Sequence, residues 1–177
     1  MATTDLTIRH ATSEDSFVVA EMIDGFAQGH PAETHSRSAA RMQAAFFCEP
    51  PVAQLLLAER GSRVIGFGAW RRTYDVFWSM FGGEALALYV RPSHRGSGVA
   101  ACIVAAICAE IRESGGHFLQ TNYDSHWAPL YERVAVGRSE RACHISARAF
   151  EVLAASAGGS ARQIIRALPD KTLNYVS

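Results

Sequence analysis

Residues 84–116 read EALALYVRPSHRGSGVAACIVAAICAEIRESGG. The first part, Ala85 to Val90, is an unbroken apolar run that lies between two glycines and Pro92, and it is typical of a strand buried on both faces. After a short turn rich in arginine and glycine, apolar residues recur at helical spacing up to a stop at Gly115: Val99, Cys102, Ile103, Ala106, Ile107 and Ile111. The stretch therefore predicts a buried strand, a tight turn and a long helix.

The turn before this helix is suited to an anion. The first N–H groups of a helix have no internal partner, and the aligned peptide dipoles place partial positive charge there. Gly96 and Gly98 lack a Cβ, so an anionic group can approach their amides, and Arg95 adds a full positive charge. We expect a phosphate site here, most naturally for a diphosphate, although glycines also close ordinary strand-to-helix turns.

The rest of the chain alternates predicted strands and helices. Further strands are predicted at residues 6–9, 54–59, 64–71, 117–122 and 142–145. Helices are predicted from Ser13 as N-cap to Gly25 or Gly29, and over residues 32–47, 124–135, 147–157 and 160–168. Without internal repeats or linkers, the pattern predicts a single domain over residues 1–177.

The hexapeptide Arg95-Gly96-Ser97-Gly98-Val99-Ala100 resembles the R/Q-x-x-G-x-G/A signature of the GNAT N-acetyltransferase superfamily. The resemblance extends from about Leu6 to about Val136. It implies an α/β fold with a mixed, mostly antiparallel, splayed sheet flanked by helices. The family usually ends in two strands, so the atypical helical C-terminal extension at about residues 146–177 predicts that helices replace one of them.

The same resemblance implies acetyl-CoA as co-substrate and no metal. Main-chain groups at the end of the central strand would bind the pantetheine arm, at Leu88, Tyr89 and Val90. Amides of the turn would bind the diphosphate, at Arg95, Gly96, Ser97, Gly98, Val99 and Ala100. Asp124 stands where the family commonly has an asparagine that contacts the cofactor. The competing interpretation is a core strand–helix unit without a ligand.

Two residues are the candidate catalytic groups. Tyr131 resembles the family's helix-borne tyrosine, whose phenol can protonate the departing thiolate, although Ala135 and Val136 replace the usual glycine and aromatic residue. Glu84 lies eleven residues before Arg95, the spacing of the glutamate base in histone-type relatives, whereas many small-molecule relatives place it where this chain has Leu86. The alternatives are a core tyrosine and a solvated glutamate.

Other side chains are weaker candidates. His30, Glu33 and His35 lie where relatives often form a substrate wall, but the histidine spacing is not a convincing metal pair. The aromatic segment 73–81 could line an acceptor pocket or cover the sheet, and we favour cover: Tyr74, Phe77, Trp78 and Phe81. Asp75 or Asp124 could attract an amine, and a cluster is expected at the mouth of the site: Tyr123, Asp124, His126 and Trp127.

Composition limits the environment and the partners. The 177 residues are 49% hydrophobic and 19% charged with a formal net charge of zero, which gives no reason to expect a nucleic-acid partner. Four cysteines without a C-x-x-C pair suit a reducing compartment: Cys48, Cys102, Cys108 and Cys143. No apolar leader and no run of 18 apolar residues occur, so we expect a cytoplasmic protein without membrane contact.

The interpretation that follows is an N-acetyltransferase. It would move an acetyl group from acetyl-CoA to a primary amine of a small molecule or peptide, by direct attack in a ternary complex. The main alternative is a non-catalytic acyl-CoA sensor or interaction module of the same fold, because Leu86, Ala135 and Val136 depart from the family pattern. A longer acyl group and a homodimer are also compatible with the sequence.

Overall fold

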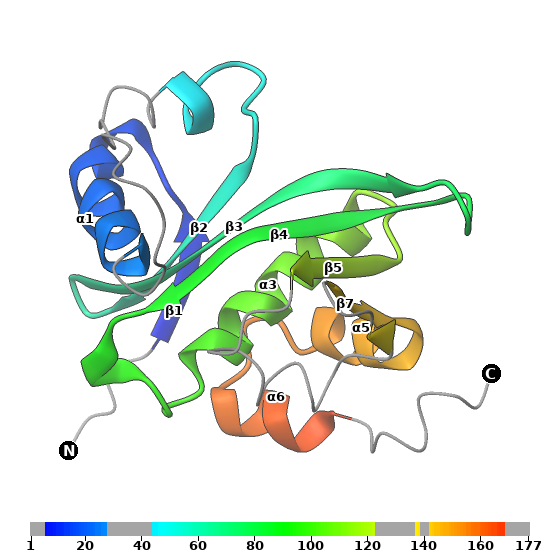
Figure 1. Ribbon diagram of the computed structural model, residues 1–177. Helices are drawn as coiled ribbons and strands as arrows, with labels where there is room; N and C mark the ends of the chain where they lie inside the picture. The colour runs from blue at the N-terminus through cyan, green and yellow to red at the C-terminus, as the bar shows by residue number, and fades with distance from the viewer. Residues whose placement is uncertain (1–5, 28–43, 123–136, 139–141, 169–177) are drawn as a thin grey trace.

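The computed structural model describes residues 6–27, 44–122, 137–138 and 142–168 (Figure 1). In these ranges seven strands form one sheet in the order β1-β2-β3-β4-β5-β7-β6, and every neighbouring pair is antiparallel except β4 and β5. The strands are β1 (Leu6–His10), β2 (Gln54–Arg60), β3 (Arg63–Asp75), β4 (Met80–Val90), β5 (Phe118–Asn122), β6 (Gly137–Arg138) and β7 (Ala142–Ser146). The helices are α1 (Ser16–Ala27), α3 (Val99–Glu113), α5 (Ala147–Ala155) and α6 (Ala161–Ala167).

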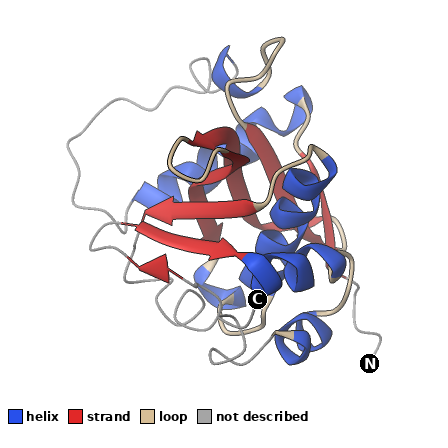
Figure 2. Ribbon diagram, turned by 90° about the vertical axis from the view of Figure 1, so that its right-hand side faces the viewer, coloured by secondary structure: helices blue, strands red, loops and turns tan. Residues whose placement is uncertain are grey.

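Helices cover both faces of the sheet (Figures 1 and 2). Helix α1 packs on one face, where Val19 and Met22 join the buried side chains of β2 and β3. Helices α3, α5 and α6 share the core of the other face. This arrangement confirms the predicted fold class, a mixed and mostly antiparallel sheet flanked by helices. Within the described ranges, no helix has the length and apolar character needed to cross a lipid bilayer.

Helix α3 lies close to the sheet because β3 and β4 carry glycines beneath it. A Cβ on Gly68 would lie 2.5 Å from Cγ2 of Ile103, and a Cβ on Gly83 would lie 2.3 Å from Cδ1 of Ile111. Both isoleucines are almost completely buried. The strand glycines therefore make room for branched side chains of α3 at short range.

Helix α1 lies equally close to the opposite face. A Cβ on Gly25 would lie 2.5 Å from the Tyr89 hydroxyl oxygen and 2.9 Å from Cζ of the same ring. Tyr89 is buried and packs against Phe67. Of the two predicted helix ends, Gly25 is wrong, because α1 continues to Ala27, and Gly29 lies outside the described residues. Gly25 instead lies at the close contact between helix and sheet.

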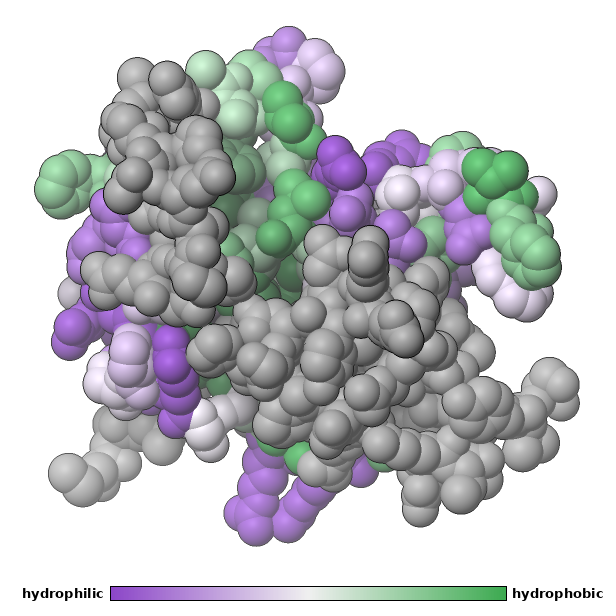
Figure 3. Space-filling view, viewed as in Figure 1, coloured by the Kyte–Doolittle hydropathy of each residue, from purple (hydrophilic) through white to green (hydrophobic). Residues whose placement is uncertain are grey.

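The hairpin of β3 and β4 extends further than the sequence suggests. The register runs out to Asp75 opposite Met80, so much of the segment that we expected to cover the sheet is strand. Its aromatic side chains are exposed: Tyr74 by 48%, Phe77 by 85%, Trp78 by 67% and Phe81 by 52%. They form the apolar end at the right of Figure 3. The predicted covering role is therefore wrong, since these rings pack on each other rather than on a core.

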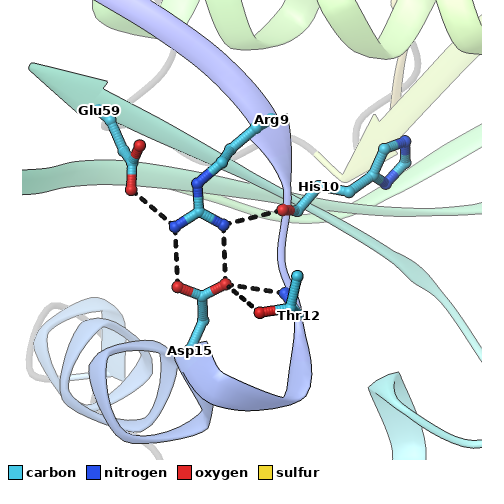
Figure 4. Close-up of polar contacts among 5 residues, drawn as sticks. All are labelled: Arg9, His10, Thr12, Asp15 and Glu59. Carbon is cyan, nitrogen blue, oxygen red and sulfur yellow. Dashed lines mark hydrogen bonds and ion pairs between the residues drawn. The ribbon is translucent and has the colours of Figure 1, made fainter.

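Polar contacts tie the first strand to the single 3-10 turn (Ser13–Asp15) that leads into α1, and to β2 (Figure 4). The Arg9 guanidinium donates to both carboxylate oxygens of Asp15, at 2.7 and 2.8 Å, and to Glu59 at 2.6 Å. Asp15 also accepts from the main-chain N–H and the hydroxyl of Thr12. Thr12, rather than the predicted Ser13, is thus the capping residue, and the hydrogen bond from Arg9 is the main reason why the pKa of Asp15 lies well below its ordinary value.

The C-terminal part combines strands and helices. The two-residue strand β6 and the longer β7 precede α5 and α6. The prediction that helices replace one of the final strands is therefore wrong, because both strands are present and the helices follow them. Ser160 caps α6 by accepting from the amide of Gln163 at 3.4 Å, and the Gln163 side chain accepts from the main-chain N–H of Ser160 at 2.8 Å.

Two predicted helices lie wholly or largely outside the described residues. Of residues 32–47, the structure describes a helical segment at 44–46 and the following residue, and it describes none of 124–135. The other predicted strands and helices are confirmed, with boundaries shifted by a few residues. The prediction of one domain over residues 1–177 stays a prediction.

Candidate active site

Strands β4 and β5 run together only over a short distance. Gly83 pairs with Leu119, and the ladder continues for two further pairs until Ala85 faces Thr121. Strand β4 nevertheless continues to Val90, so the edge of its second half has no strand partner among the described residues. The two strands therefore form a fork that opens after Ala85.

A β-bulge marks the opening of this fork. On β3, Ala69 and Trp70 are adjacent, but they pair with Ala87 and Ala85, so Leu86 is the extra residue of β4. A bulge bends its strand and redirects the local side chains. Leu86 is 42% exposed, which departs from the expectation that the whole run from Ala85 to Val90 is buried on both faces.

The main-chain groups of β4 alternate between β3 and the fork. The amide of Arg91 donates to the Ile65 carbonyl at 2.9 Å, which fixes the phase of the antiparallel ladder. By alternation, the main-chain groups of Tyr89 face β3, and those of Leu88 and Val90 face away from it. The Val90 carbonyl already accepts from Nε of Arg95 at 3.0 Å.

The turn into α3 presents a row of peptide N–H groups. The amide of Arg95 donates to the Pro92 carbonyl at 3.3 Å, and the next amide with a backbone acceptor is that of Cys102, which donates to Gly98 at 3.2 Å. Among the described residues, no acceptor takes a hydrogen bond from the six amides between them, those of residues 96–101. This is the arrangement with which a helix N-terminus binds an anion.

The two glycines of the turn have different roles. Both have positive φ, 73° at Gly96 and 82° at Gly98, a conformation that favours glycine. A Cβ on Gly96 would meet no atom of the described residues within 4 Å, so none of these residues fills the space beside this amide. A Cβ on Gly98 would lie 2.2 Å from the Cβ of Ala161, so Gly98 also lets α6 approach the start of α3.

Two arginines hold the ends of this turn. The Arg95 guanidinium lies 5.9 Å from the ring centre of Tyr89, in addition to its bond to Val90. Arg91 donates to the Val64 carbonyl at 3.0 Å and forms an ion pair with Glu21 of α1 at 2.8 Å. The hydrogen bond between Arg91 and Glu21 raises the pKa of Arg91 and lowers the pKa of Glu21. The end of β4 is thus tied to both β3 and α1.

Glu84 lies at the base of the fork, one residue before the ladder ends. Nε and Nη2 of Arg71, directly opposite on β3, both lie 2.8 Å from Oε2 of Glu84. Oε1 of Glu84 takes no hydrogen bond from the described residues. The sequence did not predict Arg71 as a site residue. Arg71 pairs with Glu84 across the strands only because the β3–β4 hairpin extends through residues 73–81.

The structure brings together only part of the predicted site. Glu84, the end of β4 and the turn into α3 lie along one continuous segment that borders the fork. Several predicted residues lie outside the described residues: Tyr131, Asp124, Tyr123, His126, Trp127, His30, Glu33 and His35. The carboxylate of Asp75 accepts from the main-chain amide of Trp78 at 2.9 Å, in the hairpin turn. In the described ranges, no group of three or more histidine, cysteine or acidic side chains is placed to hold a metal ion.

The fold and one family model connect this site to known proteins. Residues 51–134 match the model of the acetyltransferase (GNAT) domain, a range that includes the fork, Glu84 and the turn into α3. A search of curated proteins by sequence finds no match.

Several solved structures share the fold at low sequence identity. A candidate acetyltransferase from Salmonella typhimurium, YncA with acetyl-CoA, has a TM-score of 0.59 at 20% identity and covers 80% of this chain and 94% of its own. The ribosomal-protein-alanine N-acetyltransferase of Brucella melitensis biovar Abortus has a TM-score of 0.64 at 18% identity, with 77% and 94% covered. The aminoglycoside acetyltransferase meta-AAC0020 from an uncultured soil sample has a TM-score of 0.60 at 14% identity, with 72% and 85% covered.

These likenesses agree with the order of elements around the fork. The family model matches the segment that contains the open edge of β4 and the N-terminus of α3, and the first two solved structures cover 80% and 77% of this chain. Residues 51–134 therefore resemble the acetyltransferase (GNAT) domain, and the chain has the fold of the GNAT acetyltransferases.

Proposed function

We propose that the protein transfers an acetyl group from acetyl-CoA to a primary amine of a small molecule or peptide. The observation that carries the proposal is the row of amides at residues 96–101, which have no acceptor among the described residues and lie directly after the open edge of β4. Solved structures of the same fold include one with acetyl-CoA and one named as an N-acetyltransferase, which agrees with this chemistry.

The residues present fit coenzyme A as a ligand. The amides of Gly96 to Ala101 would bind the diphosphate, with the open space beside Gly96 as the approach. The main-chain groups of Leu88 and the main-chain N–H of Val90, which face the fork, would pair with the pantetheine arm in the manner of an added strand, while the Val90 carbonyl accepts from Arg95. The proposed set of cofactor-binding groups is smaller than the sequence prediction, because the main-chain groups of Tyr89 face β3 and the amide of Arg95 already donates to the Pro92 carbonyl.

Glu84 would act as the general base. A protonated amine must lose a proton before its lone pair can attack a thioester, and Oε1 of Glu84 is the oxygen left to accept that proton, directly or through water. Attack forms the C–N bond and breaks the C–S bond, and the Tyr131 hydroxyl would then give its proton to the thiolate. The role of Tyr131 rests on the sequence resemblance alone.

Binding can be tested without knowledge of the acceptor. Ser97→Glu places a negative charge in the exposed turn and should weaken acetyl-CoA binding, measured by calorimetry, by at least about tenfold, since one charge opposed to a phosphate contributes about 1–4 kcal/mol. Ser93→Glu, at an exposed position four residues earlier, is the matched control. Equal affinities for the two variants, or no binding by the wild type, would overturn the proposed site.

Catalysis is tested by free-thiol release with a panel of amines, amino acids and peptides. Glu84→Gln should lower kcat by about 10²-fold or more with little change in acetyl-CoA affinity, as expected for loss of a general base. Tyr131→Phe should also lower kcat. Unchanged turnover in either variant would remove that residue from the mechanism.

The ion pair of Glu84 with Arg71 favours a second candidate, an acyl-CoA-binding module without catalysis, because the proposed base already has a cationic partner. Tight acetyl-CoA binding combined with no thiol release across the amine panel would favour this candidate over the enzyme.

A further inference from the structure

The most unusual surface of the described chain is the end of the β3–β4 hairpin, residues 72–81, which we call the aromatic arm. It contains six of the nine large apolar side chains that are exposed in the described ranges: Tyr74, Val76, Phe77, Trp78, Met80 and Phe81. Figures 1 and 3 show the arm projecting away from the rest of the molecule, with its apolar side chains at the end. Contiguous exposed apolar groups of this kind mark interaction sites.

The arm is held in shape by its own contacts. The rings of Tyr74 and Phe81 pack edge to face across the two strands at 5.0 Å, and the Arg72 guanidinium lies 5.3 Å from the Phe81 ring centre. In the turn, Asp75 accepts from the Trp78 amide, and the Trp78 ring packs against Phe77 at 5.1 Å. A surface that is already ordered loses less conformational entropy on association than a flexible loop.

The composition of the arm is that of a protein interface. Residues 72–81 include arginine, tyrosine, tryptophan, phenylalanine and methionine, which are enriched in interface cores. Of the residue types depleted there, the segment contains one aspartate and one serine, and no lysine, glutamate or alanine. Residues 76–81 carry no charge. Burial of this surface against another apolar surface therefore leaves no unpaired charge.

The exposed apolar area of the arm fits a second copy of the chain as its partner. From their exposed fractions, the four aromatic residues offer about 400–600 Å², given that one such residue buries about 150–250 Å². Two arms packed together would bury about 800–1,200 Å² before Val76 and Met80 are added, which approaches the 1,200–2,000 Å² of stable interfaces. A two-fold axis would also allow Arg72 of one arm to approach Asp75 of the other.

We propose that the aromatic arm is the interface of a homodimer, in which the arms of two copies of this chain pack against each other around a two-fold axis. The proposal does not depend on the acetyltransferase activity. The contact would be made by the end of the β3–β4 hairpin and not by β6 and β7, which lie at one edge of the sheet.

Analytical ultracentrifugation of the full chain, from about 1 to 100 μM, tests the proposal. We expect the wild type to reach the dimer mass, and the double variant Phe77→Ser/Trp78→Ser to stay monomeric with an unchanged circular dichroism spectrum. Val76→Glu is a second variant, since it places two like charges near the axis. Phe17→Ser is the matched control, because Phe17 is 83% exposed but lies on α1, and this variant should dimerise like the wild type.

A monomeric wild type at every concentration would overturn the proposal, and so would a dimer that persists in both arm variants. Flotation with phosphatidylcholine–phosphatidylserine vesicles tests the alternative that the aromatic arm contacts a membrane. A monomer that floats with vesicles through Phe77 and Trp78 would replace the dimer with a membrane contact.

Discussion

Replacement of Gly68 by alanine should destabilise the protein even though alanine is intrinsically better than glycine inside a strand. The backbone of Gly68 is not in the left-handed region, so alanine alone would gain about 0.5–1 kcal/mol. Its new methyl group, however, would lie 2.5 Å from Cγ2 of Ile103 and 3.1 Å from Cδ1 of Ile107, both fully buried on α3. Overpacking of this kind costs about 1–3 kcal/mol.

The expected net loss is about 1–2 kcal/mol in the free energy of unfolding. For a chain of this size it corresponds to a fall in Tm of about 2–8 °C. Urea denaturation followed by circular dichroism should show a lower midpoint concentration of urea and an unchanged dependence of the unfolding free energy on urea, because neither the folded nor the unfolded state changes its compactness.

A second substitution shows whether the Ile103 contact is the cause. Ile103→Leu removes the branched Cγ2 while it nearly conserves volume, so alone it should cost less than about 1.5 kcal/mol. Combined with Gly68→Ala, it should recover at least about 0.5 kcal/mol relative to the sum of the single changes. A Gly68→Ala protein as stable as the wild type, or additive single changes, would refute the reasoning.

Three further predictions concern stability and reactivity. Asp15→Asn should lower the free energy of unfolding by about 1 kcal/mol at neutral pH. Because the Arg9 contact lowers the pKa of Asp15 in the folded state, this loss should shrink as the pH falls below about 4, which urea titrations at a series of pH values would measure. A loss of stability that does not depend on pH would contradict the role of the ion pair. Glu110→Ala should lower the free energy of unfolding by about 1–3 kcal/mol, because the buried indole N–H of Trp70 loses the carboxylate that accepts from it at 2.9 Å. Glu110→Gln keeps an acceptor and should lower the free energy of unfolding clearly less. Burial raises the pKa of the Cys108 thiol, so Cys108→Ala should leave thiol labelling of the native protein unchanged and remove one labelled thiol only in denaturant.

The central segment was predictable because its signals are local. The apolar run to Val90, the restriction imposed by Pro92 and the helical spacing up to Gly115 each act within a few residues, so strand, turn and helix follow from the sequence in order. The positive φ angles at Gly96 and Gly98 belong to the same class of local signal. The turn that we propose to bind the diphosphate could therefore be located without the structure.

The aromatic segment shows where local reasoning failed. Its apolar rings suggested burial, but the sequence of residues 73–81 does not determine whether another element of the fold covers them. In the fold the hairpin extends past the helices, so Phe77 and Trp78 remain exposed. Burial is a property of the neighbours that a side chain meets, and those neighbours come from distant parts of the chain.

The sequence by itself determined the order of strands and helices, the glycine-containing turn before α3 and the resemblance to the GNAT superfamily, because periodicity, glycine and proline act over short distances. Only the tertiary structure decided that β4 separates from β5 after Ala85, that Arg71 lies opposite Glu84, and that Gly25 and Gly68 serve close packing rather than chain termination or a turn. These features depend on register and on contacts between residues far apart in sequence, where a shift of a single residue would exchange the two faces of a strand.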